Sequence, residues 1–134
     1  MLRPNLTTYN GYQWIVNKWF GPLDGTRELC SPSWFHVYET PELAVLHNPI
    51  HANYDPLVLY KAEFRGWCLR ENYIKMGVTE LRLSTEVKAP KYSTEQRVYY
   101  GIIAALQVYK SADFCAWARR WIDGSDRTTE AAAW

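Results

Sequence analysis

Two segments in the middle of the chain alternate apolar and polar residues with the period of a β-strand. In "LVLYKAEFR" the apolar residues that share one face are Val58, Tyr60, Ala62 and Phe64. In "TELRLSTEV" the corresponding inward set is Leu81, Leu83, Thr85 and Val87. Each strand therefore has one apolar and one polar face. This pattern is typical of an antiparallel sheet with one side open to water.

The N-terminal part is predicted to add two more strands. After a turn at Asn10-Gly11, the aromatic and β-branched residues of "YQWIV" favour a strand. A loop follows, because "FGPLDGTREL" contains both Gly-Pro and Asp-Gly. The next predicted strand is "SWFHVY", in which Trp34, His36 and Tyr38 share one face.

A short helix is expected directly after this strand. Thr40 is a good N-cap, and Pro41 suits the first helical position, where no N–H is needed. Glu42 then lies where the helix dipole favours a carboxylate. The pair Asn48-Pro49 predicts the end of the helix.

The last third of the chain changes to a helical period. Ser93 and Gln96 have the spacing of a capping box at the start of "STEQRVYYGIIAALQVY". The apolar stripe of this helix comprises Val98, Ile102, Ala105 and Tyr109. A second helix, "ADFCAWARRWID", is expected to end at Gly124. The three terminal alanines predict a third helix that starts at Ser125 or Thr128.

These elements predict one α+β domain spanning residues 1–134. Its mainly antiparallel sheet, over about residues 9–88, is expected to pack against the two C-terminal helices within 93–134. A chain of 134 residues has the size of one ordinary domain.

Charge and cysteine content narrow the functional classes. Lys and Arg total 15 against 14 Asp and Glu, which argues against a nucleic-acid or membrane surface that binds mainly by charge. The chain shows no secretory leader and no apolar run long enough to cross a membrane. Its three cysteines, Cys30, Cys68 and Cys115, are far apart, which favours buried thiols in a reducing cytoplasm.

Catalytic and metal-binding signals are weak. The sequence has no nucleophile motif and no Gly-rich phosphate loop, so no cofactor is expected. His47 and His51 would share one face of a continuous helix, as metal ligands do, but the break predicted between them argues against a metal site. His36 is interpreted as a core or rim histidine.

Aromatic residues are unusually frequent, with seven Trp, ten Tyr and four Phe. Such a surplus indicates either a dense core or a protein-binding face, because Trp, Tyr and Arg dominate interface energetics. By residue type, the first candidates for binding are Trp117, Arg120 and Trp121, followed by Trp67 and Arg70.

Several segments together resemble uncharacterised domains encoded by bacteriophages and prophages. The segments are "FHVYETPELAVLH", "LVLYKAEFRG", "KMGVTELRLSTEV", "STEQRVYYGIIAALQVY" and "FCAWARRWIDGSDRTTEAAAW". In that family a Gly-(Phe/Leu)-His segment precedes a short helix, and an "EQR" helix leads into "WLDGxDR" and an Ala/Trp-rich tail. Here Trp34 stands where the family has glycine. The resemblance implies a phage accessory protein in the host cytoplasm and brings no established activity.

A more distant resemblance is to the ADP-ribosyltransferase fold, carried by "FHVYETPELAVLH" and the strand after it. It implies an NAD cleft in which the nicotinamide would meet Tyr12, His36 and Tyr38, with Glu80 as the acid. The first strand lacks the His-x-Thr or Arg of that family, and no Gln/Glu-x-Glu precedes a late strand.

The favoured functional expectation is a non-enzymatic accessory protein that binds a host or phage protein, for example to inhibit a bacterial defence system. The alternative is an NAD-dependent ADP-ribosyltransferase-like enzyme or a degenerate relative. A third interpretation is a virion or assembly component, which would self-associate.

Overall fold

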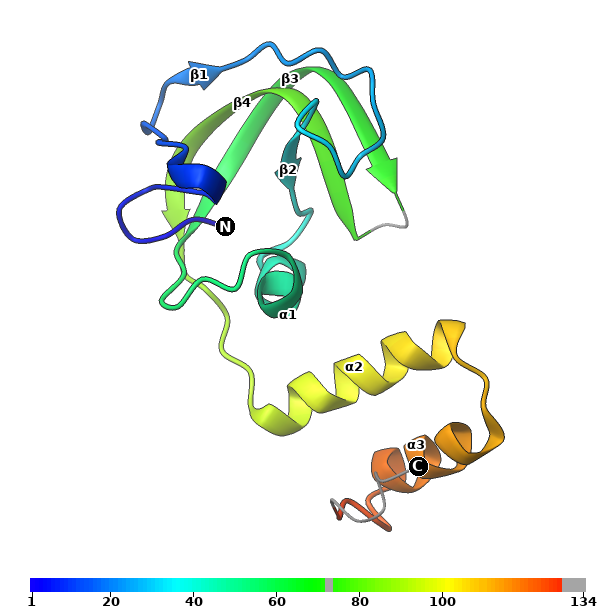
Figure 1. Ribbon diagram of the computed structural model, residues 1–134. Helices are drawn as coiled ribbons and strands as arrows, with labels where there is room; N and C mark the ends of the chain where they lie inside the picture. Colours follow the sequence, from blue (N-terminus) through cyan, green and yellow to red (C-terminus); the bar gives the residue numbers. More distant parts are fainter. Residues whose placement is uncertain (72–73, 129–134) are drawn as a thin grey trace. The chain divides into compact units, whose positions relative to one another are not determined.

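The computed structural model describes residues 1–71 and 74–128. In chain order the elements are η1 (Tyr9–Gly11), β1 (Trp19–Phe20), β2 (Phe35–Val37), α1 (Pro41–His51), β3 (Leu59–Glu71), β4 (Lys75–Val87), α2 (Thr94–Val108) and α3 (Ala112–Asp123) (Figure 1). They confirm the α+β class. The chain divides into two compact units, residues 1–90 and 91–134, here called the sheet unit and the helical unit. That the two pack into a single domain stays a prediction.

β4 is the central strand of the sheet. It pairs with β3 along one edge, and along its other edge with β1 and β2, which lie one after the other. The pairings Trp19↔Arg82 and Phe35↔Val78 fix the positions of these two short strands. All three pairings are antiparallel, so the predicted sheet type is confirmed.

The first predicted strand is wrong in position. In place of a strand at "YQWIV", η1 is followed by irregular backbone, and β1 begins only at Trp19. Positive φ angles at Asn10 (54°) and Asn17 (64°) bend the chain on either side of this segment. Trp14 is nevertheless buried there, with its ring 4.8 Å from Phe20 and 5.2 Å from Phe35, centroid to centroid.

The core of the sheet unit confirms most of the inward positions predicted for the two long strands. Its buried members are Leu2, Trp14, Phe35, Met76, Val78, Leu81 and Leu83. Two predicted inward positions are wrong: 45% of Phe64 is exposed, and Thr85, near the end of β4, is exposed as well. Phe64 pairs with Leu81 on β4 and so shares its face of the sheet, but it lies on an outer strand.

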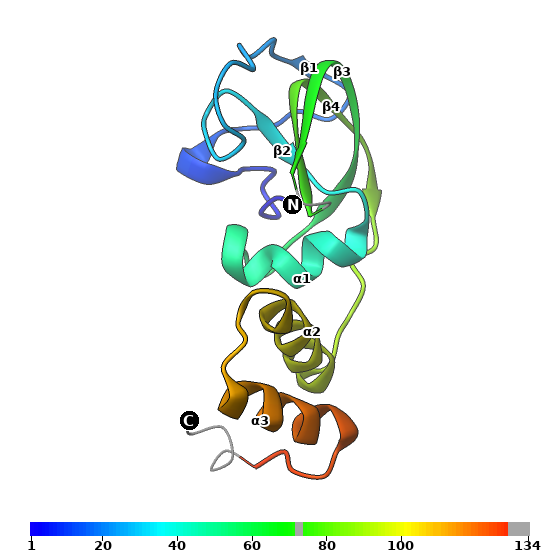
Figure 2. The ribbon, with the colours of Figure 1, turned by 90° about the vertical axis from the view of Figure 1, so that its right-hand side faces the viewer.

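Helix α1 begins as predicted and ends later than predicted. The Thr40 side chain accepts the Leu43 N–H at 3.2 Å. The helix then continues through Pro49 to His51. Pro49 removes only one backbone donor from the helix. The buried Asn48 side chain bonds both the N–H and the carbonyl of Tyr54, and these two bonds hold the loop that follows the helix. The predicted break at Asn48-Pro49 is therefore wrong. Figure 2 shows α1 lying across one end of the sheet.

The helical unit consists of α2, α3 and the segment that follows them. The predicted capping box is present, with Ser93 and Gln96 bonded to each other's backbone N–H. The buried core comprises Ile102, Phe114, Ala118 and Trp121. Gly124 ends α3 with φ 82°. Residues 125–128 form no helix, and the rest of the predicted third helix lies outside the described residues.

Candidate functional site

The sheet unit contains a cavity of about 580 Å³. Its apolar lining includes Trp14, Val37, Leu59, Met76, Leu81 and Leu83. Four of these six residues belong to the core, where packing normally leaves few voids larger than a water molecule. A cavity of this size falls within the range of ligand-binding pockets.

Polar side chains converge on the same cavity. They include His36, Tyr38, Glu39, Lys61 and Arg70. β2 supplies His36, the junction between β2 and α1 supplies Tyr38 and Glu39, and β3 supplies the two cations. An ion pair of 2.9 Å joins Arg70 Nη1 to Glu39 Oε1. The Arg70 side chain is 57% exposed, which places this pair at the solvent side of the cavity.

Next to the cavity, three aromatic side chains form a stack. His47 and His51 have ring centroids 5.3 Å apart, and Tyr38 lies 5.9 Å and 6.0 Å from them. The Tyr38 hydroxyl is hydrogen-bonded to His51 Nδ1. His47 Nδ1–H donates to the Leu43 carbonyl at 2.9 Å. Because the helix continues through Pro49, the two histidines keep the shared face that the predicted break would have separated.

A metal site does not follow from this stack. Across residues 1–71 and 74–128, no three His, Cys, Asp or Glu side chains are placed to hold a metal ion together. The two ring nitrogens whose bonds are known already have partners in Leu43 and Tyr38.

Electrostatics keep two of the histidines neutral near pH 7. Desolvation lowers the pKa of His51 below its usual 6.5, and the positive charge of Lys75 lowers it further. Desolvation also lowers the pKa of His36, although its hydrogen bond to the Leu29 carbonyl at 2.5 Å opposes this effect. The ammonium of Lys75 itself donates to Cys30 Sγ at 3.1 Å.

The structure brings together two of the four residues proposed for an NAD cleft. His36 and Tyr38 both line the cavity. Tyr12 is not among the lining residues, and its ring packs on Trp14 at 5.2 Å. Glu80 is not among them either, and it pairs with Arg65 at 2.7 Å.

Sequence reasoning missed Glu39 and the His47–His51 stack. Glu39 carried one available signal, since it lies at a predicted strand-to-helix junction. The signal for the stack is the i, i+4 spacing of His47 and His51, but a helix break at Pro49 would have separated the two rings.

A second candidate region lies on β3. Trp67 is 71% exposed, and the nearby Leu69 is 37% exposed. Beside them is a groove of about 350 Å³ lined by Glu28, Leu29, Cys30, Leu69 and Arg70. We call Trp67, Leu69, Arg70 and residues 28–30 the Trp67 surface. Cys30 and Cys68 are both exposed, so the prediction of buried thiols is wrong for them.

A β-bulge positions Trp67. The register with β4 shifts between Arg65 and Cys68, and Gly66 adopts φ 78° there. The Trp67 N–H donates to the buried Thr79 hydroxyl at 3.0 Å. The backbone of Trp67 is thus fixed, while its indole is left in solvent.

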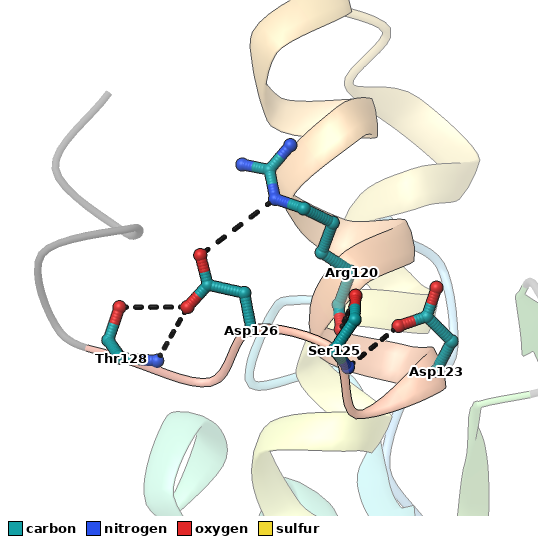
Figure 3. A network of polar contacts seen from close by, with 5 residues as sticks. All are labelled: Arg120, Asp123, Ser125, Asp126 and Thr128. Atoms are coloured by element: carbon teal, nitrogen blue, oxygen red, sulfur yellow. Dashed lines mark hydrogen bonds and ion pairs between the residues drawn. The ribbon is translucent and has the colours of Figure 1, made fainter.

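The other three predicted binding residues, Trp117, Arg120 and Trp121, lie in α3, and Figure 3 shows Arg120 with the polar contacts at the end of this helix. Trp121 is only 8% exposed and belongs to the core of the helical unit, and Trp117 packs against that core. Arg120 Nε lies 3.9 Å from Asp126, which also accepts the Thr128 N–H at 3.1 Å. Their role as partner contacts stays a prediction.

Comparison of the chain with protein-family models, with curated proteins and with solved structures found no match. Among the described residues, no helix has both the length and the apolar character needed to span a membrane.

Proposed function

We propose that this chain is a non-enzymatic protein-binding module whose contact region is the Trp67 surface. The proposed setting is a phage accessory protein that occludes a host or phage protein in the host cytoplasm, for example a component of a defence system. The observation that carries the proposal is the 71% exposed indole of Trp67, held on a fixed backbone. Exposed Trp flanked by apolar side chains and an Arg is the composition of an interface hot spot.

The position of β3 supports a particular binding mode. Within the described residues β3 pairs with β4 alone, and only the bridge Leu2↔Val58 lies against the chain just before it. An edge strand of this kind can accept an extended segment of a partner as an additional strand. The groove beside Leu69 would then hold a partner side chain, and Trp67 would cover the added strand.

The bulges in β3 argue for a short partner segment. Register shifts occur at Tyr60/Ala62 and Arg65/Cys68, so regular pairing is interrupted twice along the edge. Bulges and edge charges, such as Lys61 and Arg65, discourage pairing with a full sheet. A partner strand of a few residues beside Cys68–Arg70 meets no such interruption.

The test is affinity capture from a bacterial host lysate followed by amide hydrogen exchange on the captured complex. The double variant Trp67→Ala, Leu69→Ser should lose the partner that wild type retains. Tyr9→Ala is the matched control, because Tyr9 is 80% exposed and lies outside the Trp67 surface. In the complex, slower exchange is expected at residues 68–70.

Two outcomes would overturn this assignment. Retention of the partner by the Trp67→Ala, Leu69→Ser variant would remove the Trp67 surface from the interface. Loss of the partner from a folded Trp117→Ala, Arg120→Ala variant, with no change in exchange on β3, would move the interface to α3.

A second candidate function is an NAD-dependent ADP-ribosyltransferase-like enzyme or a degenerate relative. The observation that favours it is the presence of both His36 and Tyr38 on the cavity wall. An active enzyme would consume NAD, and His36→Ala would abolish that turnover. Wild-type protein that leaves NAD intact in the presence of host lysate would reject the catalytic form.

A further inference from the structure

The cavity of the sheet unit separates an apolar interior from a polar mouth. Trp14 is 6% exposed, and Leu81 and Leu83 are each 4% exposed. Lys61 is exposed, and the Arg70 side chain is 57% exposed. A molecule that fills this space would therefore place an apolar part inside and a polar part at the mouth.

The interior offers few hydrogen-bonding groups to a ligand. The indole N–H of Trp14 already donates to the Thr8 hydroxyl at 3.0 Å. Most of the remaining wall is apolar, from residues such as Leu59 and Met76, and Tyr60 also contributes to it. A polar ring system would lose its hydrogen bonds to water here, whereas an alkyl chain would lose none.

The mouth favours a negative charge. The lining includes two cationic residues, Lys61 and Arg70, and one carboxylate, Glu39, which pairs with Arg70; the charge of Lys61 also acts on Glu63, outside the lining. His36 adds a neutral imidazole, because desolvation lowers its pKa. A ligand carboxylate can approach Lys61 directly and can share the fork of Arg70 with Glu39.

We propose that this cavity binds an amphipathic carboxylate, with an alkyl chain against Leu59, Met76 and Leu83 and the carboxylate at Lys61 and Arg70. This site shares Arg70 with the Trp67 surface, whereas Trp67 and Leu69 are not among its lining residues. The Trp67→Ala, Leu69→Ser variant therefore tests the protein contact alone, and the Ala62→Phe and Lys61→Gln variants test the cavity.

The test uses sodium decanoate as the probe in isothermal titration calorimetry with the full chain. Decanol tests the contribution of the charge, and NAD tests the nucleotide alternative. Dioctanoylphosphatidylglycerol distinguishes a chain carried by a lipid from a free acid. Saturable binding of decanoate that is tighter than binding of each of the other three supports the proposal.

Variants locate the binding. Ala62→Phe fills the cavity from β3 and should weaken decanoate binding at least about tenfold, because the alkyl chain loses its apolar contacts. Lys61→Gln, at an exposed position that does not affect the core, should weaken decanoate about threefold and leave decanol unchanged. Arg65→Gln, on the same strand but outside the lining, should bind as wild type does.

Three results would overturn the proposal. The first is no measurable binding of decanoate to folded wild type. The second is equal binding by wild type and the Lys61→Gln variant together with equal affinity for decanol. The third is binding of NAD in preference to decanoate, which would assign the cavity to the second candidate function instead.

Discussion

The two units use tryptophan in opposite ways. In the helical unit Trp121 is 8% exposed and forms part of the core, whereas in the sheet unit Trp67 is 71% exposed. Both lie in segments with a clear apolar pattern. The difference comes from topology, because the apolar stripe of α3 faces α2, whereas β3 has a neighbouring strand on one edge only. Residue type alone does not separate a core aromatic from a contact aromatic.

The units differ in their ionisable groups as well. All three histidines of the chain, His36, His47 and His51, fall in the sheet unit. In the helical unit two carboxylates, Asp123 at the end of α3 and Asp126 just beyond it, accept hydrogen bonds from Ser125 and Thr128, respectively. The two units should therefore respond to different ranges of pH.

The largest expected effect is on the helical core. Trp121→Ala should cost about 3–5 kcal/mol, since it empties a buried aromatic site in a small core. Trp67→Ala should change stability by no more than about 0.5 kcal/mol, because the indole is in solvent. Amide hydrogen exchange in α2 and α3 measures the loss caused by Trp121→Ala, and exchange in β4 measures the change caused by Trp67→Ala. Equal losses in the two variants would remove the contrast between the units.

A smaller loss of stability is expected when the hydrogen bond between the Trp67 N–H and the Thr79 hydroxyl is removed. Thr79→Val keeps the shape of the side chain but removes the hydroxyl that accepts the Trp67 N–H. We expect a loss of about 1–3 kcal/mol in the unfolding free energy of the sheet unit. Thr85→Val, at an exposed position of the same strand, is the control and should change little. A neutral Thr79→Val would mean that water replaces the hydroxyl as acceptor.

The smallest expected effect is a difference between the two units in the pH at which each begins to lose stability. The folded-state pKa values of His36 and His51 are lowered, mainly by desolvation, so the unfolded chain binds more protons as pH falls below 6.5. The sheet unit should therefore begin to lose stability below pH 6.5. Hydrogen bonds from Ser125 and Thr128 lower the pKa values of Asp123 and Asp126. The stability that these two ionised carboxylates give the helical unit should therefore be lost only as the pH falls below about 3.8.

Exchange protection of β4 and α2, measured from pH 7.5 to pH 5 and corrected for intrinsic rates, tests this order. The double variant His36→Gln, His51→Gln should flatten the response of β4 in that window. A parallel loss of protection in α2 would contradict the assignment of the response to the sheet unit.

Local features were predictable from the sequence. The Thr40 cap, the Ser93/Gln96 capping box and the alternation around Leu81 and Leu83 depend on residues only a few positions apart. Neighbouring residues decide caps and faces, so a single sequence contains enough information for them.

Features that depend on distant partners were not predictable. β1 lies at Trp19–Phe20 because these residues pair with Arg82 and Leu81, far along the chain. The cavity arises where several elements fail to fill the space between them, and no local pattern encodes that. The exposure of Trp67 likewise depends on which edge of β4 the strands β1 and β2 occupy.

The central position of β4 also determines an order of assembly. The β3–β4 hairpin closes over a short connection, whereas β1 and β2 must arrive from distant parts of the chain. Contacts between nearby residues form sooner, because less chain entropy is lost in closing a short loop. We therefore expect the β3–β4 hairpin to form early. The edge of β4 that does not face β3 then stays unpaired along Met76–Val78 until β2 docks. During that interval the nascent protein avoids aggregation only if self-association is slow or a chaperone covers the open edge.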